Sequence, residues 1–274
     1  MQQAIYYHDM ELKMNTAKDL KTNYEPLYLV PDLVAAMPTE LTRTALFSLL
    51  PTQKRRAVVK DKIICSRSDI ELYFSGEELD VRDETLFLAM LRLSQKEAFG
   101  EKVYFTISEL LKETGKTETG GINGSINIVC SRIDRLSHAH LKIKFKRNNK
   151  VCKFTTRLIE YGIEETNDAF KVYFRLDHDA AELYHNLAYQ DWQVRLKLKS
   201  DMAKKLLTYI TGHKSGTAHK QKLDNLRRWF GYGGQLYRFR PACFKALKEI
   251  EAMGIIENIE YSKTEVYWLR TAIK

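Results

Sequence analysis

Hydrophobic and polar positions in the middle of the chain follow a helical rhythm. The apolar residues are spaced by four, three, four and three positions: Ile122, Ile126, Val129, Ile133 and Leu136. This spacing predicts an α-helix with one apolar face. Small and polar residues fall opposite that face: Gly124, Asn127, Ser131 and Arg135, with Asn123 and Arg132 on its flanks. A helix with so little bulk on its outer face can lie deep in a groove.

The residues after this helix alternate between apolar and cationic positions. Residues 141–146 and 151–156 are expected to form two strands joined by an Asn148-Asn149 turn. The cations of this hairpin suit contacts with phosphates or a minor groove: Lys144, Lys146, Arg147 and Lys150. A polar-faced helix followed by a cationic hairpin predicts a winged-helix unit that binds DNA.

A similar order of elements recurs toward the C-terminus. A short helix over 223–230 ends at Gly231, and a longer helix is expected from Pro241 to Met253, with Phe244, Leu247 and Ile250 inward. A hairpin over 255–261 and 265–270 follows. Gly231 would then correspond to Gly115, which ends a short helix expected over 109–114, and the strand starting at Ile255 to the strand starting at Leu141. The predicted fold class is α+β, with two tandem winged-helix domains that arose by duplication; chance similarity of two α+β segments stays open.

The domain limits follow from this repetition. Residues 1–40 form an N-terminal arm, 41–175 the first winged-helix domain and 176–274 the second. Within the first domain, Asp83 is the expected N-cap of a helix that runs to Ala98. Chain length is ample for two domains, since the protein has 274 residues of which 44% are hydrophobic.

Composition excludes several classes of protein. No apolar run approaches the roughly 20 residues that cross a bilayer, and the N-terminus lacks the pattern of a signal peptide. Four scattered cysteines without a C-x-x-C pair predict neither a zinc site nor a disulfide framework. We therefore expect a cytoplasmic protein without a membrane partner, a bound metal or another cofactor.

The distribution of charge favours a polyanionic partner. The net charge is +9. Residues 131–161 hold nine basic and two acidic residues, and residues 191–248 hold fourteen basic and three acidic residues, so the remainder is net acidic. Two basic segments on an otherwise acidic chain predict two contact regions for double-stranded DNA.

Particular side chains can be given roles in such contacts. In the first unit Asn127 and Arg135 suit adenine and guanine edges, Ser131 is a weaker base contact, and Arg132 and Asn123 suit phosphates. The candidates of the second unit lie on or before its long helix: Arg238, Arg240, Lys245 and Lys248. Of these, Lys245 is expected to point away from the apolar face of that helix. For each residue alone, a solvated surface charge is the alternative.

One pair of histidines resembles a catalytic motif. His138 and His140 match the His-hydrophobe-His pattern of metal-dependent rolling-circle nicking enzymes. Here the pair falls where a helix passes into a strand, whereas metal ligands at i and i+2 share a face only within a strand. A surface histidine pair is the preferred interpretation, and the protein is expected not to be an enzyme.

Several motifs, in order, resemble the TrfA-type family of plasmid replication initiators. They are Arg43-Thr44-Ala45-Leu46-Phe47-Ser48, Phe74-Ser75-Gly76-Glu77-Glu78-Leu79-Asp80, and Gly100-Glu101-Lys102-Val103-Tyr104-Phe105-Thr106-Ile107-Ser108-Glu109-Leu110-Leu111. A weaker match extends from Leu176 through Trp192 to His213. One departure is Phe87, where the family often carries tryptophan.

The resemblance implies binding of repeated sites (iterons) at a plasmid origin, opening of an adjacent AT-rich segment and loading of the helicase. Implied partners are the host replication initiator, the replicative helicase and the sliding clamp, for which Leu46-Phe47 is the candidate binding peptide. A self-dimer, a winged-helix transcriptional regulator and, less favoured, the nicking enzyme stay open.

Overall fold

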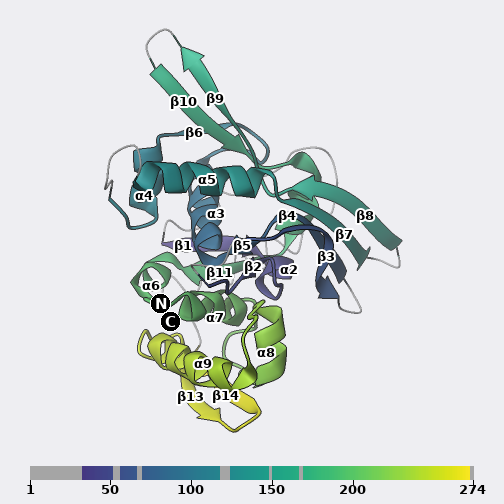
Figure 1. The fold of residues 1–274 in the computed structure, drawn as a ribbon, viewed down its shortest axis with the longest axis vertical. Helices are drawn as coiled ribbons and strands as arrows, with labels where there is room; N and C mark the ends of the chain where they lie inside the picture. The colour runs from purple at the N-terminus through teal and green to yellow at the C-terminus, as the bar shows by residue number, and fades with distance from the viewer. Residues whose placement is uncertain are drawn as a thin grey trace.

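The computed structural model describes residues 33–51, 56–66, 70–117, 124–147, 150–166 and 169–271. The protein is a mixed α and β structure in which two units are stacked along the long axis (Figure 1). The elements of the upper unit are β1 (Val34–Pro38), α2 (Thr39–Thr42), β2 (Phe47–Ser48), β3 (Val58–Ser66), β4 (Ile70–Glu77), β5 (Leu79–Asp80), α3 (Val81–Leu93), η2 (Ser94–Lys96), β6 (Val103–Phe105), α4 (Ile107–Glu113), α5 (Ser125–Ser137), β7 (His140–Arg147), β8 (Lys150–Arg157), β9 (Glu160–Thr166), β10 (Ala169–Arg175), η4 (His178–His185) and β11 (Leu187–Asp191). Helix α6 (Trp192–Lys197) leads into the lower unit, which contains α7 (Asp201–Thr211), β12 (Ala218–Lys222), α8 (Leu223–Trp229), α9 (Leu236–Glu251), β13 (Ile256–Tyr261) and β14 (Glu265–Arg270).

The two units share an order of elements and of strands. The series α3, β6, α4, α5, β9, β10 in the upper unit corresponds to α7, β12, α8, α9, β13, β14 in the lower one. The strand orders are β6-β10-β9 and β12-β14-β13, so in each case the last strand of the hairpin pairs with the first short strand. In Figure 1 the hairpin β9–β10 projects from the upper end of the molecule.

A glycine ends the second helix of each series. Gly115 has a φ of 70° and Gly231 a φ of 60°, a region that favours glycine. The N–H of the next residue bonds to a carbonyl five residues back in both cases, from Lys116 to Leu111 and from Tyr232 to Arg227, at 3.0 Å each. This is the Schellman helix end. The two glycines that the sequence pairs therefore occupy the same position in the two units.

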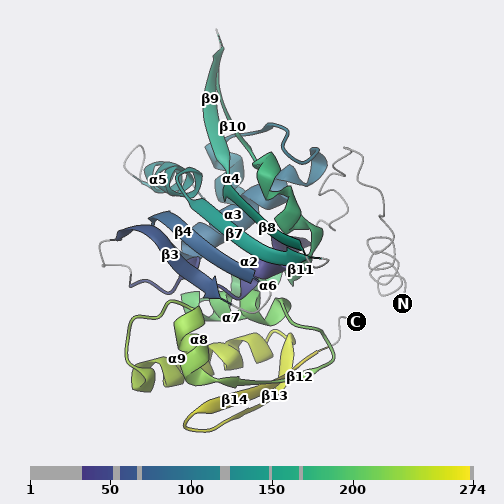
Figure 2. The ribbon, with the colours of Figure 1, turned by 90° about the vertical axis from the view of Figure 1, so that its right-hand side faces the viewer.

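The hairpin after α5 belongs to another sheet. Strand β7 pairs with β8 as predicted, but its other edge pairs with β4, in the order β3-β4-β7-β8 (Figure 2). The buried side chains of β7, Leu141 and Ile143, lie opposite Phe74 and Leu72 of β4 and share one core with them. The predicted correspondence of Leu141 with Ile255 is wrong, because the counterpart of β13 is β9. Alternation predicts a strand and its buried face but not its neighbour in the sheet.

Each unit has its own hydrophobic core. The largest fully buried apolar side chains of the upper core include Phe47, Phe87 and Phe174, and those of the lower core include Phe239 and Trp268. Strand β1, within the predicted arm, pairs with β11, within the predicted second domain. The ladder thus crosses both predicted boundaries, and the domain limits themselves stay a prediction; residues 1–32 lie outside the described part.

Two helix starts differ from the predictions. Helix α9 begins at Leu236, so Pro241 lies inside the helix, where it lacks the N–H that would bond to the carbonyl of Tyr237. Helix α3 is capped by Asp80, whose carboxylate accepts from the N–H groups of Arg82 and Asp83 at 2.8 and 3.0 Å. Asp83 completes a capping box by accepting from the N–H of Asp80 at 2.9 Å. Two aspartates three residues apart made the cap ambiguous in the sequence.

Candidate nucleic-acid interface

Helix α9 presents a cationic face away from the lower core. The helix buries Phe239, Cys243, Ala246, Leu247 and Ile250. Arg238, Lys245 and Lys248 are exposed, and Arg240 is half-buried. Their spacing of seven and three residues places the three exposed cations on one side of the helix. The prediction that Lys245 points away from the core is confirmed.

Aromatic rings lie among these cations. The Arg238 guanidinium lies 5.6 Å from the ring centroid of Tyr237, and the Lys248 ammonium lies 5.8 Å from that of Phe244. The Phe244 ring stacks on Tyr261 of β13 with centroids 4.0 Å apart, and Tyr237 is 67% exposed. Phe244 was expected to point inward, but it lies on the half-buried flank. Cations beside rings suit a partner that offers both phosphates and bases.

Helix α5 presents an outer face of another kind. Its exposed residues are Asn127, Ile128, Cys130, Ser131 and Asp134. All of Ser125–Ser137 is described, and none of the exposed residues in that range is cationic. The predicted base readers Asn127 and Ser131 lie on this face beside Ile128, which is 54% exposed. Asn123 lies outside the described residues.

The two arginines of α5 turn toward α3. Arg132 Nη1 lies 3.0 Å from Asp83 Oδ1 and 3.4 Å from Asp80 Oδ1, and Arg135 Nη2 lies 2.9 Å from Asp83 Oδ1. Only 11% of the Arg132 side chain and 14% of the Arg135 side chain are exposed. The predicted outward position of Arg135 is wrong. The helical wheel placed its Cα opposite the apolar face, but its long side chain bends back to a buried carboxylate.

Arg56 completes this ionic cluster. It lies 2.5 Å from Asp80 Oδ2 through Nη2 and 3.1 Å from Asp83 Oδ2 through Nη1. Burial alone would raise the pKa of Asp80, but the Asp83 N–H, Arg132 and Arg56 together hold this pKa below its usual value. Sequence reasoning missed Asp80 and Asp83 as partners of α5 and Arg56 as the third arginine of this cluster, because no local spacing joins residues so far apart.

Three lysines of the four-stranded sheet line an open groove of about 570 Å³: Lys142, Lys144 and Lys153. Lys144 Nζ lies 3.1 Å from Glu71 Oε1, and Lys142 Nζ lies 2.9 Å from Asp61 Oδ1. The hydrogen bond from Lys144 lowers the pKa of Glu71. Residues Lys146, Arg147 and Lys150 lie in β7 and β8 by their backbone, and the structure does not describe their side chains. The two predicted regions of DNA contact in the first unit, α5 and this hairpin, adjoin in the chain but belong to separate layers.

The hairpin β9–β10, which the sequence did not single out, is joined to α5. The Tyr161 hydroxyl donates to the Asp134 carboxylate, and this bond raises the pKa of Tyr161 to about 12. Farther along, the Lys102 ammonium lies 4.3 Å from the ring centroid of Tyr173. Apolar residues alternate with Lys171, Tyr173 and Arg175 over 170–175, which is a signal for one strand of this hairpin. No spacing in the sequence indicates that the hairpin contacts α5.

The histidine pair lies where the sequence placed it. His138 is the C-cap residue of α5, and its Nδ1 is 2.7 Å from the Asp134 carbonyl. His140 opens β7, and burial lowers its pKa. Among the described residues, no three metal-binding side chains gather into a cluster.

The candidate peptide for binding a sliding clamp lies inside the upper unit. Leu46 and Phe47 are 2% and 0% exposed in the upper core, so they are unsuited to bind a sliding clamp as an exposed peptide.

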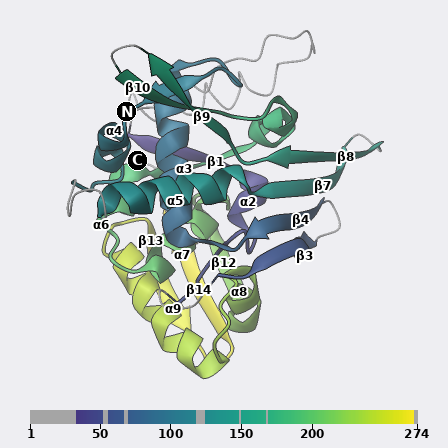
Figure 3. The ribbon, with the colours of Figure 1, turned by 45° about the horizontal axis from the view of Figure 1, so that its top comes forward.

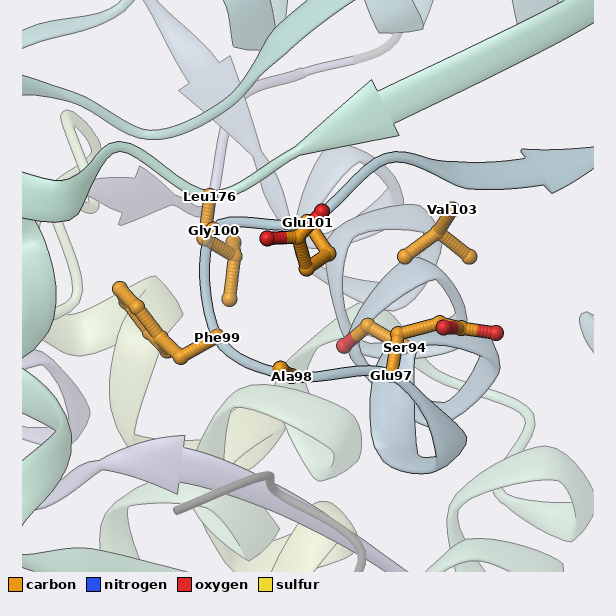
Figure 4. A pocket seen from close by; sticks show the side chains of 8 residues that line it. All are labelled: Ser94, Glu97, Ala98, Phe99, Gly100, Glu101, Val103 and Leu176. Carbon is orange, nitrogen blue, oxygen red and sulfur yellow. The ribbon is translucent and has the colours of Figure 1, made fainter. Parts of the chain in front are cut away.

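A hollow near η2 holds about 10 Å³, room for one water molecule (Figure 4). No described helix has the length and apolar character needed to cross a bilayer.

Comparisons with known proteins agree with the resemblance seen in the sequence. The model of the family described as TrfA protein matches residues 3–267. The plasmid replication initiator protein TrfA of Escherichia coli is 22% identical over 234 residues, which are 83% of this chain and 59% of that protein. The chain therefore spans less than two thirds of that relative.

Solved structures share the fold. A crystal structure of domains 2 and 3 of RctB superposes with a TM-score of 0.58 at 13% identity, covering 86% of this chain and 99% of that one. A second structure of the same RctB domains gives a TM-score of 0.53 at 12% identity over 82% and 95% of the two chains. The match of the family model over residues 3–267 shows that this chain belongs to the TrfA family.

Proposed function

We propose that this protein is a plasmid replication initiator that binds repeated double-stranded DNA sites at an origin. The observation that carries the proposal is the family match over residues 3–267. The exposed cations of α9 and the basic segments of the chain support a polyanionic partner.

Both units act as winged-helix domains in this proposal. The shared series of a helix, a strand, two helices and a hairpin supports it, as does the pairing of the last strand with the first. Helices α5 and α9 are then the recognition helices, because each is the second helix of its pair, and the major groove is about 12 Å wide and admits one helix. The wings are β9–β10 and β13–β14. The hairpin β7–β8 is an insertion, and its Lys144, Lys146, Arg147 and Lys150 contribute phosphate contacts.

The two recognition helices differ in what they offer to DNA. Asn127 suits an adenine edge, Ser131 is a weaker polar contact, and Ile128 suits a thymine methyl group. On α9, Lys245 and Lys248 suit phosphates, and Arg238 and Arg240 suit guanine or phosphate. Arg132 and Arg135 contribute by fixing α5 against α3. They reach DNA directly only if their ion pairs with Asp83 open.

The later steps of initiation follow from the same proposal. Bound initiators open an adjacent AT-rich segment and bring in the host initiator, the replicative helicase and the sliding clamp. These steps rest on what the resemblance to the TrfA-type family implies.

Selection of duplexes from a random-sequence library tests DNA binding. The expected product is one sequence that recurs in the DNA flanking the reading frame as direct repeats. A plasmid that carries those repeats should replicate only when the protein is supplied. Binding to the repeats without support of replication would indicate a transcriptional regulator, and failure to enrich any duplex would contradict the proposal. A covalent protein–DNA product on supercoiled DNA with divalent metal would indicate the nicking enzyme instead.

A further inference from the structure

Three consecutive residues in the first turn of α3 contact three different elements. Arg82 lies 3.3 Å from Asp201 at the start of α7. Asp83 holds α5, and Glu84 holds α6. In Figures 1 and 3, α3 runs between α5 and the lower unit. One helical turn thus touches a proposed recognition helix on one side and the start of the other unit on the other side.

On the side of α5, several hydrogen bonds to one buried carboxylate hold the contact in a fixed geometry. The Asp83 side chain is 0% exposed and accepts from Arg56, Arg132 and Arg135 and from the backbone N–H of Asp80. A buried carboxylate with this many donors allows little change of geometry, since each lost bond would leave a charge unsatisfied. Helix α5 therefore keeps a fixed position on α3.

On the side of the lower unit, the central residue is Arg195 of α6. Its Nη2 lies 3.2 Å from Glu84 Oε2 and 3.0 Å from Thr85 Oγ1, both on α3. Its Nη1 lies 3.1 Å from Gln190 Oε1 of β11 and 2.9 Å from Thr208 Oγ1 of α7. Both side chains of the Glu84–Arg195 pair are 0% exposed. One guanidinium therefore joins α3, β11 and α7.

A second buried cation crosses the same joint. Lys205 of α7 is 0% exposed, and its ammonium lies 3.1 Å from the carbonyl of Thr44 in the upper unit. At the edge of the joint, the N–H of Leu49 donates to the carbonyl of Phe230 at 2.8 Å. The contact between the units is therefore polar at its centre, whereas each unit's own core is apolar.

A gain in stability does not explain why the centre of the contact between the units is polar. A buried ion pair is often replaceable by apolar residues without loss of stability, because desolvation offsets the attraction. The pair is also incompletely satisfied, since neither Glu84 Oε1 nor Arg195 Nε has a hydrogen-bond partner among the described residues. Directional bonds to several elements do, however, restrict the joint to one geometry, as polar groups do in other buried interfaces.

We propose that the first turn of α3 and Arg195 form a rigid joint that fixes the distance and rotation between α5 and α9, so that the protein selects the spacing of the two DNA segments it contacts. This inference rests on the proposed function, because it requires both helices to bind one duplex. Arg195, Glu84 and Thr208 are positioning residues that need not touch DNA. Inserting one base pair rotates the segments by about 34° relative to each other, which a rigid joint cannot follow.

The test measures affinity against spacing. The probe is the duplex that the wild-type protein enriches from a random library, with its two contacted segments located by footprinting, and with one base pair inserted or removed between them. The first variant is Glu84→Leu/Arg195→Met, which removes both charges together and retains apolar bulk. The second is Thr85→Val/Thr208→Val, which keeps the charges and removes the hydroxyls that hold Arg195 on its two sides. The matched control is Asp61→Asn, which removes an ion pair outside the joint.

One inserted base pair should weaken wild-type binding by about tenfold, comparable with a mismatched base. The control should respond like the wild type, and the joint variants should lose about threefold or less while keeping affinity for the original duplex. If the joint variants fold and lose as much affinity on insertion as the wild type, the proposed role of the joint is wrong. If the first variant does not fold, the second variant decides. If the wild-type protein tolerates the insertion, or contacts a single segment, this inference is wrong but the proposed function stands. If no duplex is enriched, the proposed function fails and the inference with it.

Discussion

Helices α5 and α9 occupy corresponding places in two units of the same topology, yet they carry opposite surfaces. The arginines of α5 bind carboxylates of α3, and its exposed face includes Asn127, Ile128 and Ser131 but no cation. The cations of α9 are exposed, and rings of Tyr237 and Phe244 lie beside them. A shared position in a fold therefore fixes where a helix lies, while the residues that it exposes decide what it can bind.

The largest expected effect concerns the stability of α5 on α3. Asp83→Ala removes the buried carboxylate that Arg56, Arg132 and Arg135 share, and should lower the free energy of unfolding by about 3–5 kcal/mol. The control is Glu251→Ala on α9, whose carboxylate forms an exposed ion pair with Lys248 and should contribute less than about 1 kcal/mol. Urea unfolding followed by circular dichroism measures both. Equal effects would mean that the buried cluster is no more important than a surface pair.

Acid should affect the two units at different pH. Burial, with Arg43 nearby, lowers the pKa of His213 from 6.5 to about 4. Between these values the unfolded chain binds a proton that the folded protein does not, so stability falls as pH falls through this window. From pH 7 to pH 5 the loss should be about 2 kcal/mol, and His213→Gln should remove it. Asp80 has a lowered folded pKa, so its contribution is lost only below about pH 4. An unchanged pH dependence in His213→Gln would contradict this assignment.

The next effect separates base contacts from charge contacts. Asn127→Ala should reduce discrimination between the selected duplex and a scrambled duplex by about 1–3 kcal/mol, because a bidentate amide contact to adenine is lost. Binding to scrambled DNA should hardly change. Fluorescence anisotropy on the two duplexes measures this difference, with Thr155→Ala on the four-stranded sheet as control. A parallel loss on both duplexes would show that Asn127 contributes affinity without specificity.

The smallest effect belongs to the cations of α9. Lys245→Ala should weaken binding to all duplexes by a similar factor and reduce the slope of log affinity against log salt by about 1. Titrations at several salt concentrations give the slope. If the mutation instead changes base preference at an unchanged slope, α9 reads sequence in the way proposed for α5, and the contrast between the two helices disappears.

The sequence predicted where helices and strands lie in the chain better than it predicted which elements pair or pack together. Apolar spacing placed α5, and glycines placed the ends of α4 and α8, because local periodicity and helix ends are local properties. The partner of β7 and the burial of Arg135 depended on β4 and α3, which lie far away in the chain. The outward position of Lys245 was predicted correctly, and within the described part of the chain no carboxylate of another element pairs with it. Asp80 and Asp83, in contrast, pair with the two arginines of α5. Long polar side chains are the hardest to place from a helical wheel, since they can bend toward a distant partner.

Cleavage of DNA from probes on the two helices tests the central claim most directly. Iron-EDTA tethered to exposed Cys130 places a cleaving centre on α5, and Lys245→Cys in a Cys130→Ser background places one on α9. The Cys130→Ser protein alone gives the background from the remaining cysteines. Our account predicts two clusters of cuts on the selected duplex, about one helical turn apart and on the same face. Cuts from a single helix, or two clusters on opposite faces of the duplex, would contradict it.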